Sequence, residues 1–166
     1  MAVPSNVTKA VGLALLVGLA VFHGSASAHD ADGIQVLEAW AKASLAGTTN
    51  GAAYVTLSNR GAEDDRIVGA ESPVAATAEL HAHVTVDGVM KMRPLVAVDL
   101  PEDATAKMAP GGLHVMLIGL TEPLTEGATF PLTLILEHAG PVHAEVTVLA
   151  PNAKGAGHGK MKMQSE

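Results

Sequence analysis

The sequence predicts an all-β domain, built as a Greek-key β-sandwich or barrel. Short alternating or apolar runs follow one another at strand-like spacing, with turn signals between them. No stretch shows a convincing helical period. Asp87-Gly88 stands between two β-branched runs, and this dipeptide is typical of two-residue hairpins. The expected strands are residues 34–41, 52–57, 67–70, 74–86, 89–98, 113–120, 129–138 and 142–149.

Turn residues and one proline set the limits of these strands. Residues 45–51 are expected to form a loop, and residues 101–112 a polar, alanine-rich connection. Pro94 interrupts the 89–98 run. Because proline has no N–H to donate, that strand suits an edge or a bulge better than the middle of a sheet. Only four residues are aromatic, so we expect a core of Val, Leu, Ile and Ala. Shorter turns are expected at 59–61, 126–127 and 139–141.

The first 28 residues have the composition of a secretory signal peptide. Lys9 precedes a run of 13 small and apolar residues, and an A-x-A site ends at Ala28. That run is shorter than the roughly 20 residues needed to span a bilayer, so we expect cleavage after Ala28 and no membrane insertion of the mature chain. We therefore predict a periplasmic protein with a folded domain at residues 29–150 and a flexible tail at residues 151–166.

Charge and cysteine content argue against several classes of protein. The formal net charge is −7, and loss of Lys9 with the first 28 residues makes it −8, so the chain repels nucleic acid and anionic lipid. There is no cysteine, so the chain has no disulfide and no thiolate ligand. A blue-copper electron carrier needs a cysteine thiolate beside two histidines and is therefore excluded.

Soft metal ligands recur between Glu79 and Leu120. Thioether sulfur is a neutral, polarisable donor that suits Cu(I) and competes poorly for Mg, Ca or Mn. Zinc sites draw on Cys, His, Asp and Glu and hardly ever on Met. Two imidazoles and two thioethers in one stretch therefore predict a Cu(I) site. The four predicted ligands are His81, Met92, His114 and Met116.

Strand alternation places these donors on shared faces. His81 and His83 share one face of their strand, and His114 and Met116 share one face of theirs. The predicted hairpin would bring His81 roughly opposite Met92. Taken singly, each methionine could be core packing and each histidine an ordinary half-exposed residue. The shared faces and the spacing together favour ligation.

The spacing His81-x10-Met92-x21-His114-x-Met116 resembles, position for position, the motif of the PCu(A)C family of periplasmic copper chaperones. The resemblance extends over roughly residues 34–149 and implies a cupredoxin-like version of the Greek-key architecture. It also implies that the two ligand-bearing segments approach each other. Further segments that agree with the family are residues 38–41, 51–57, 59–61 and 110–117.

The resemblance implies a copper chaperone and not an enzyme. Cu(I) would be held at the main site and passed to a copper-receiving protein, either a cytochrome c oxidase subunit at its CuA centre or another copper chaperone. Members of the family often carry a C-terminal extension with His and Met. The tail could therefore form a second copper site, and this site could also take Cu(II). The competing interpretation is a solvated tail whose methionines have no role. The candidate secondary ligands are His83, His158, Met161 and Met163.

Two other classes of protein and one further copper site remain open at this stage. A dismutase-like copper or zinc enzyme would use His81, His83 and His114 with an open coordination position. A non-metal interaction module would need an exposed apolar or aromatic patch, for which four aromatic residues give little material. His29, as a new amino terminus, could chelate Cu(II) through its free amine and its imidazole.

Overall fold

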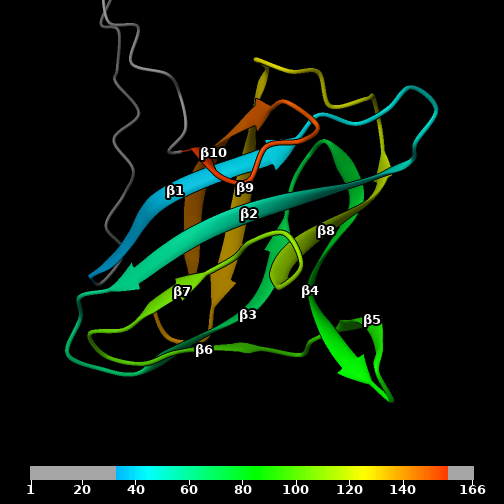
Figure 1. The fold of residues 1–166 in the computed structure, drawn as a ribbon. Helices are drawn as coiled ribbons and strands as arrows, with labels where there is room; N and C mark the ends of the chain where they lie inside the picture. Colours follow the sequence, from blue (N-terminus) through cyan, green and yellow to red (C-terminus); the bar gives the residue numbers. More distant parts are fainter. Residues whose placement is uncertain (1–32, 157–166) are drawn as a thin grey trace, which may run out of the picture.

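The computed structural model describes residues 33–156, and these residues form ten strands and no α-helix (Figure 1). The prediction of an all-β domain is therefore confirmed. The predicted signal peptide, residues 1–28, lies outside the described residues. The strands are β1 (Ile34–Lys42), β2 (Asn50–Asn59), β3 (Asp65–Glu71), β4 (Ala75–Val86), β5 (Val89–Pro94), β6 (Val98–Leu100), β7 (Thr105–Lys107), β8 (Leu113–Leu120), β9 (Thr129–Leu136) and β10 (Pro141–Leu149).

Seven of these strands form a closed barrel. Their order is β4-β8-β2-β1-β10-β9-β3, and pairing of Ala70 in β3 with Ala78 in β4 closes the ring. β1 and β10 run parallel, whereas the other pairings are antiparallel. Several neighbours in the ring, such as β8 and β2, are far apart in sequence, so the chain crosses over between them. This arrangement confirms the predicted Greek-key barrel.

β5 is a separate edge strand that pairs with β4. The prediction of one strand over residues 89–98 is wrong, because β5 ends at Pro94 and β6 begins at Val98. Pro94 has no N–H to continue the ladder. The next residue, Leu95, donates its N–H to the carbonyl of Leu80 at 2.8 Å, and the chain leaves the hairpin there.

β7 lies within residues 101–112, which the sequence predicted as a connection without strands. Its three residues pair with the second half of β2, at Thr56, Leu57 and Ser58. β6 pairs in a similar way with the first half of β3. Both are short segments held by partners distant in sequence, and such pairing leaves no local periodic signal.

One hydrophobic cluster joins the strands of the barrel. The prediction of an aliphatic core is right for most of its members, but three of the four aromatic residues are buried there too. Trp40 and Tyr54 lie opposite each other on β1 and β2, with ring centroids 4.4 Å apart, and Phe130 comes from β9. Large fully buried aliphatic side chains of the cluster are Ile34, Val55, Leu57, Ile67, Leu100, Val115, Leu117, Leu132, Leu134, Val142 and Val146.

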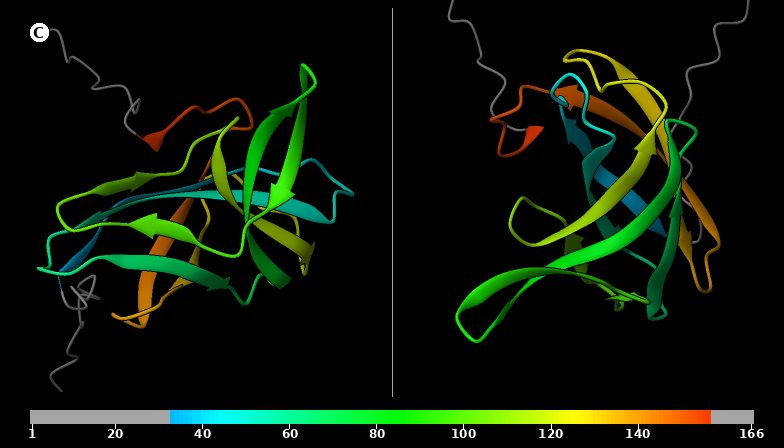
Figure 2. Two further views of the ribbon diagram at one scale, coloured as in Figure 1. Left: turned by 90° about the horizontal axis from the view of Figure 1, so that it is seen from below. Right: turned by 90° about the vertical axis from the view of Figure 1, so that its right-hand side faces the viewer.

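β4 and β5 form a hairpin that projects from the barrel (Figures 1 and 2). Asp87 and Gly88 have φ angles of 54° and 77°, and a type I′ turn requires two positive angles at these positions. The predicted hairpin is therefore confirmed. It leaves β5 exposed along its whole length and carries part of the predicted metal site away from the barrel.

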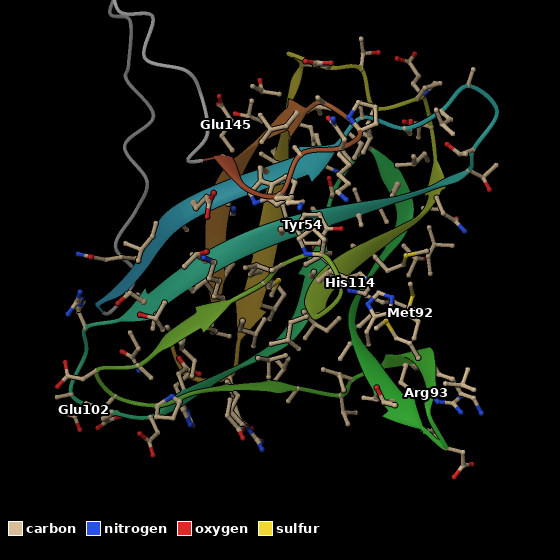
Figure 3. All side chains as sticks on the ribbon, in the orientation of Figure 1. Tyr54, Met92, Arg93, Glu102, His114 and Glu145 are labelled. Atoms are coloured by element: carbon tan, nitrogen blue, oxygen red, sulfur yellow. The ribbon has the colours of Figure 1, made fainter. Side chains whose placement is uncertain are left out.

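The register of this hairpin corrects one expectation. A two-residue turn pairs His83 with Met92 and leaves His81 opposite Pro94, so His81 does not face Met92 directly. Because side chains alternate along a strand, His81, His83 and Met92 still point to the same face. Arg93 points to the other face of β5, away from Met92 (Figure 3).

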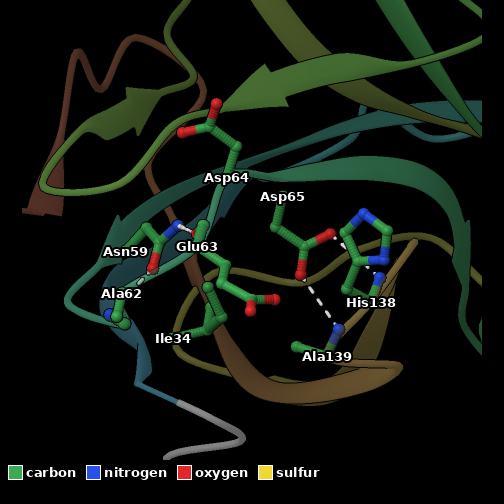
Figure 4. Close-up of a pocket in the computed structure, with 9 residues that line it drawn as sticks. Ile34, Asn59, Ala62, Glu63, Asp64, Asp65, His138 and Ala139 are labelled. Atoms are coloured by element: carbon green, nitrogen blue, oxygen red, sulfur yellow. Dashed lines mark hydrogen bonds between the residues drawn. The ribbon is translucent and has the colours of Figure 1, made fainter.

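Asp65 ties the start of β3 to the turn after β9. Its buried carboxylate accepts hydrogen bonds from the backbone N–H groups of His138 and Ala139 at 3.0 and 2.9 Å (Figure 4). It also accepts one from the backbone N–H of Arg66 at 2.7 Å. Burial by itself raises the pKa of this carboxyl, but the three donors outweigh it and hold the pKa below its usual range. Asp65 lines a surface pocket together with Glu63 and other residues of this end of the barrel.

Asp65→Asn should lower the free energy of unfolding by about 1–3 kcal/mol near neutral pH, because an amide NH₂ then faces a backbone donor. The folded-state pKa lies below the unfolded value, so the contribution of Asp65 is present above about pH 4 and is lost as pH falls through the folded pKa. Urea unfolding as a function of pH measures both effects, with Glu63→Gln as a neighbouring exposed control. Equal acid sensitivity of wild type and Asp65→Asn would contradict this role.

Candidate metal centre

The four predicted ligands lie where β4 runs between β5 and β8. His81 pairs directly with His114 across β4 and β8, and Glu79 pairs with Met116. His83 pairs with Met92 across β4 and β5. Residues that face each other in a ladder, and residues two apart on a strand, point to the same side of the sheet. The structure therefore brings His81, His83, Met92, His114 and Met116 onto one surface, which we call the donor face.

Burial changes gradually across the donor face. His114 is only 3% exposed, and the His81 side chain is 13% exposed. Met116 is partly buried on β8. Met92 is 42% exposed on the projecting hairpin, and its side chain lies on the side of β5 nearest His114 (Figure 3). The face thus has a buried end on the barrel and an exposed end on the hairpin.

Three imidazole rings gather at the buried end. The ring centroids of His83 and His114 are 5.2 Å apart, and those of His81 and His114 are 5.9 Å apart. Within residues 33–156, however, no three His, Cys, Asp or Glu side chains are arranged as a ready set of metal ligands.

In both His81 and His114, a hydrogen bond to one ring nitrogen determines which nitrogen has a lone pair for a metal. Nδ1 of His114 lies 3.0 Å from the carbonyl of Gly112, so this nitrogen carries the proton and Nε2 keeps its lone pair. Nε2 of His81 lies 2.9 Å from a carboxylate oxygen of Glu79, which leaves Nδ1 as the nitrogen with a lone pair. A carboxylate that orients a histidine in this way is a common outer partner of metal ligands.

Two imidazole nitrogens of the donor face are buried without a hydrogen-bond partner, Nδ1 of His81 and Nδ1 of His83. A buried polar atom without a partner destabilises the folded state, typically by about 1–3 kcal/mol. A cation bound at the donor face would give such atoms a partner. The chemistry of the residues fits a soft cation, because the imidazoles and thioethers are neutral donors.

His114 is held in the form that can bind a metal. Burial lowers its pKa, the Gly112 carbonyl raises it, and the nearby His83 and His81 lower it again, with a net value below the usual 6.5. Its imidazole is therefore neutral at neutral pH. Metal ligation requires this deprotonated state, so no proton has to leave His114 when a cation binds.

Sequence reasoning did not single out Glu79, and it gave His83 only as a candidate secondary ligand. Both stand two residues from His81 on the same strand, so strand alternation alone placed them on its face. The pairing of Glu79 with Met116 was not visible, because it depends on the long-range register between β4 and β8. The other predicted secondary ligands, His158, Met161 and Met163, lie outside the described residues, as does His29.

The beginning of the predicted tail lies against the barrel. The backbone N–H of Ala156 donates to a carboxylate oxygen of Glu38 at 2.6 Å, and Ala153 packs against the hydrophobic cluster. This part of the chain thus returns to β1. Among residues 33–156 there is no helix long and apolar enough to cross a membrane.

Solved structures with the same fold define the class of this domain. The apo PCuAC domain of PmoF2 is 30% identical, with a TM-score of 0.61, and the match covers 75% of this chain and 95% of that domain. The copper-bound PCuAC domain of PmoF2 is 27% identical, with a TM-score of 0.63 and coverage of 75% and 99%. CuI-DR1885 from Deinococcus radiodurans is 29% identical, with a TM-score of 0.54 and coverage of 79% and 85%. The cupredoxin-like fold and the resemblance to PCu(A)C proteins are confirmed.

Sequence comparison gives the family. The family model described as "Putative lipoprotein LpqE-like" matches residues 34–148. A relative from Leifsonia xyli subsp. xyli (strain CTCB07), described as "Putative lipoprotein Lxx21020", is 40% identical over 132 residues, which is 76% of this chain and 78% of that protein. The chain therefore belongs to the LpqE-like family.

In the metal-free protein, His114 should carry its proton on Nδ1 and should titrate below the usual histidine value. Because its folded-state pKa is lowered, its contribution to stability is present above about pH 6.5 and is lost as pH falls through the folded pKa. Long-range ¹H–¹⁵N NMR of the imidazoles across this pH range measures both the tautomer and the pKa. A proton on Nε2, or a pKa above the usual value, would contradict the geometry.

Proposed function

We propose that this protein is a copper chaperone that holds Cu(I) at His81, Met92, His114 and Met116 and passes it to another protein. One observation carries the proposal: the strand register places two imidazoles and two thioethers, spaced far apart in sequence, on one face of β4, β5 and β8. The copper-bound PCuAC domain of PmoF2 and CuI-DR1885 share the fold, and they support copper as the cargo.

The donor set favours Cu(I) for two physical reasons. Thioethers bind this ion well and bind Mg, Ca or Mn poorly, and methionine is scarce in zinc sites. The four ligands are neutral, so an ion of charge +1 enters without a compensating thiolate or carboxylate in direct contact. Nδ1 of His81 and Nε2 of His114 are the nitrogens that the hydrogen bonds leave free for the ion.

The gradient of burial suits transfer by ligand exchange. Met92 is the most exposed of the four ligands and lies on the edge strand β5, so a donor of the receiving protein can approach it first. The neutral Met and His ligands then leave one after another while the acceptor's ligands enter. Cu(I) keeps its charge throughout, and no electron or proton has to move. We expect no enzymatic turnover from this step.

The family resemblance supports two candidates for the receiving protein. We propose a cytochrome c oxidase subunit, with delivery to its CuA centre, or a further copper chaperone. The described barrel does not contribute the secondary tail ligands, so His158, Met161 and Met163 remain a proposed capture arm beyond Ala156. That arm would raise the local concentration of copper near the main site.

We also propose that the protein is exported and works in the periplasm, after cleavage behind Ala28. The signal-like composition of residues 1–28 supports export, and so does the word lipoprotein in the descriptions of its family and its relative. The chain contains no cysteine, so its proposed metal ligands cannot be lost to disulfide formation. Oxidation of the methionines to sulfoxide would still weaken the site.

Replacing Met92 and Met116 together by leucine should weaken Cu(I) binding by at least about 100-fold, because leucine keeps the bulk of methionine and removes both soft donors. An anaerobic titration against a chromogenic Cu(I) chelator measures the affinity. Met108→Leu is the matched control, since Met108 is only 2% exposed and belongs to the hydrophobic cluster. Wild-type affinity in the double variant would assign copper to the histidines or the tail and would refute the proposed ligand set.

Glu79→Gln should lower Cu(I) affinity about tenfold, since loss of an outer carboxylate partner usually costs 10–100-fold in metal affinity. Glutamine can still accept the hydrogen bond from Nε2 of His81, so the fold and the thermal stability should remain unchanged. Glu145→Gln, an exposed position on β10, is the control. The same chelator competition measures the affinity, and ¹⁵N NMR of His81 distinguishes a change in the orientation of its ring from a general loss of structure. Unchanged affinity would remove Glu79 from the site.

A further inference from the structure

The donor face continues past Met92 toward the tip of the hairpin. Met90 pairs with Thr85 across β4 and β5, two steps along the ladder from the pair of His83 and Met92. By strand alternation its side chain points to the same side as His83 and Met92. Directly opposed Cβ atoms are about 5 Å apart and diagonal ones about 7–8 Å, distances that long side chains can span.

The two sides of β5 differ in chemistry. Met90 and Met92 occupy the donor face and are 63% and 42% exposed, whereas Lys91 and Arg93 point to the other side. Exposed edge strands usually carry charged side chains, which discourage pairing with other chains. β5 has this protection in Lys91 and Arg93, whereas Met90 and Met92 expose apolar surface with little gain from burial. Two thioethers are thus accessible to solvent on the donor face.

His83 connects these methionines to the buried end of the face. The ring centroid of His83 lies 5.2 Å from that of His114, whereas the ring centroid of His81 lies 5.9 Å from it. Nδ1 of His83 is buried without a hydrogen-bond partner. The residue directly opposite it on β5 is Met92. One imidazole that lacks a partner thus stands between the proposed Cu(I) ligands and the exposed Met90.

We propose that His83 and Met90 form, with Met92 shared, a second and outer position for Cu(I) on this hairpin. This inference rests on the proposed function of the donor face and adds a step to it. Copper would pass between the inner ligands and the outer position by exchange of neutral donors, with Met92 bound in both. Its charge stays at +1, and each bond to an incoming donor replaces one to a leaving donor. Copper would therefore leave the protein at the hairpin, through Met90.

The outer position can be tested after two of the three inner ligands that it does not use have been removed. His81→Asn combined with Met116→Leu should still bind Cu(I), about 10–100-fold more weakly than wild type. Adding Met90→Leu or His83→Asn should each lower the remaining affinity a further tenfold or so. Val89→Leu, on the opposite face of the same hairpin, is the control and should change nothing. All variants carry His158→Asn, Met161→Leu and Met163→Leu, so that the tail contributes no donors.

A measurement on the unaltered chain covers the case in which these variants do not fold. With ¹³C-methyl methionine, the first equivalent of anaerobic Cu(I) should shift the Met92 and Met116 methyl signals, and further Cu(I) should shift that of Met90. A Met90 signal that stays fixed after the methyl signals of Met161 and Met163 in the tail have also stopped shifting would overturn the outer position. The outer position would also be overturned if the inner-site variants bind no copper, or if adding Met90→Leu or His83→Asn leaves their affinity unchanged. If the first equivalent leaves Met92 and Met116 unshifted, the proposed function itself fails, which is a separate result.

Discussion

The register of β4 is the constraint on which the rest of the molecule depends. This strand pairs with β8 and with β5, and one contact with β3 closes the barrel through it. A slip of one residue would turn His81 to the core side and Leu80 to the donor side. Leu80 and its partner Val115 are 4% and 0% exposed, so the hydrophobic core resists that slip. Burial of aliphatic side chains thus fixes the ligand geometry.

The same strand separates two environments along its length. Its first half lies in the barrel, where His114 is buried and neutral, and its second half lies in the projecting hairpin, where Met92 is partly exposed. A metal held only by buried ligands would leave slowly, and one held only by exposed thioethers would be bound weakly. The donor face combines a buried ligand, which would slow the loss of the ion, with an exposed one, which would let it leave.

Local signals in the sequence were enough for much of this structure. The strand 113–120 and the Asp87-Gly88 hairpin follow from apolar runs and turn chemistry, and strand alternation alone places His81 beside His83. The pairing of β4 with β8 connects residues more than 30 positions apart, and the sequence pattern carries no record of it. That is why the pairing of Glu79 with Met116 was not predicted. The expectation that His81 faces Met92 was a different kind of error, because counting back from a two-residue turn already gives His83.

X-ray absorption at the copper edge of the protein loaded with one equivalent of Cu(I) tests the central claim most directly, because it counts sulfur and nitrogen ligands without relying on variants. The proposed ligand set predicts two sulfur and two imidazole nitrogen scatterers around copper. The chain has no cysteine, so any sulfur detected is thioether sulfur. A first shell with nitrogen and oxygen alone would contradict the methionine ligands and would leave histidines as the copper ligands.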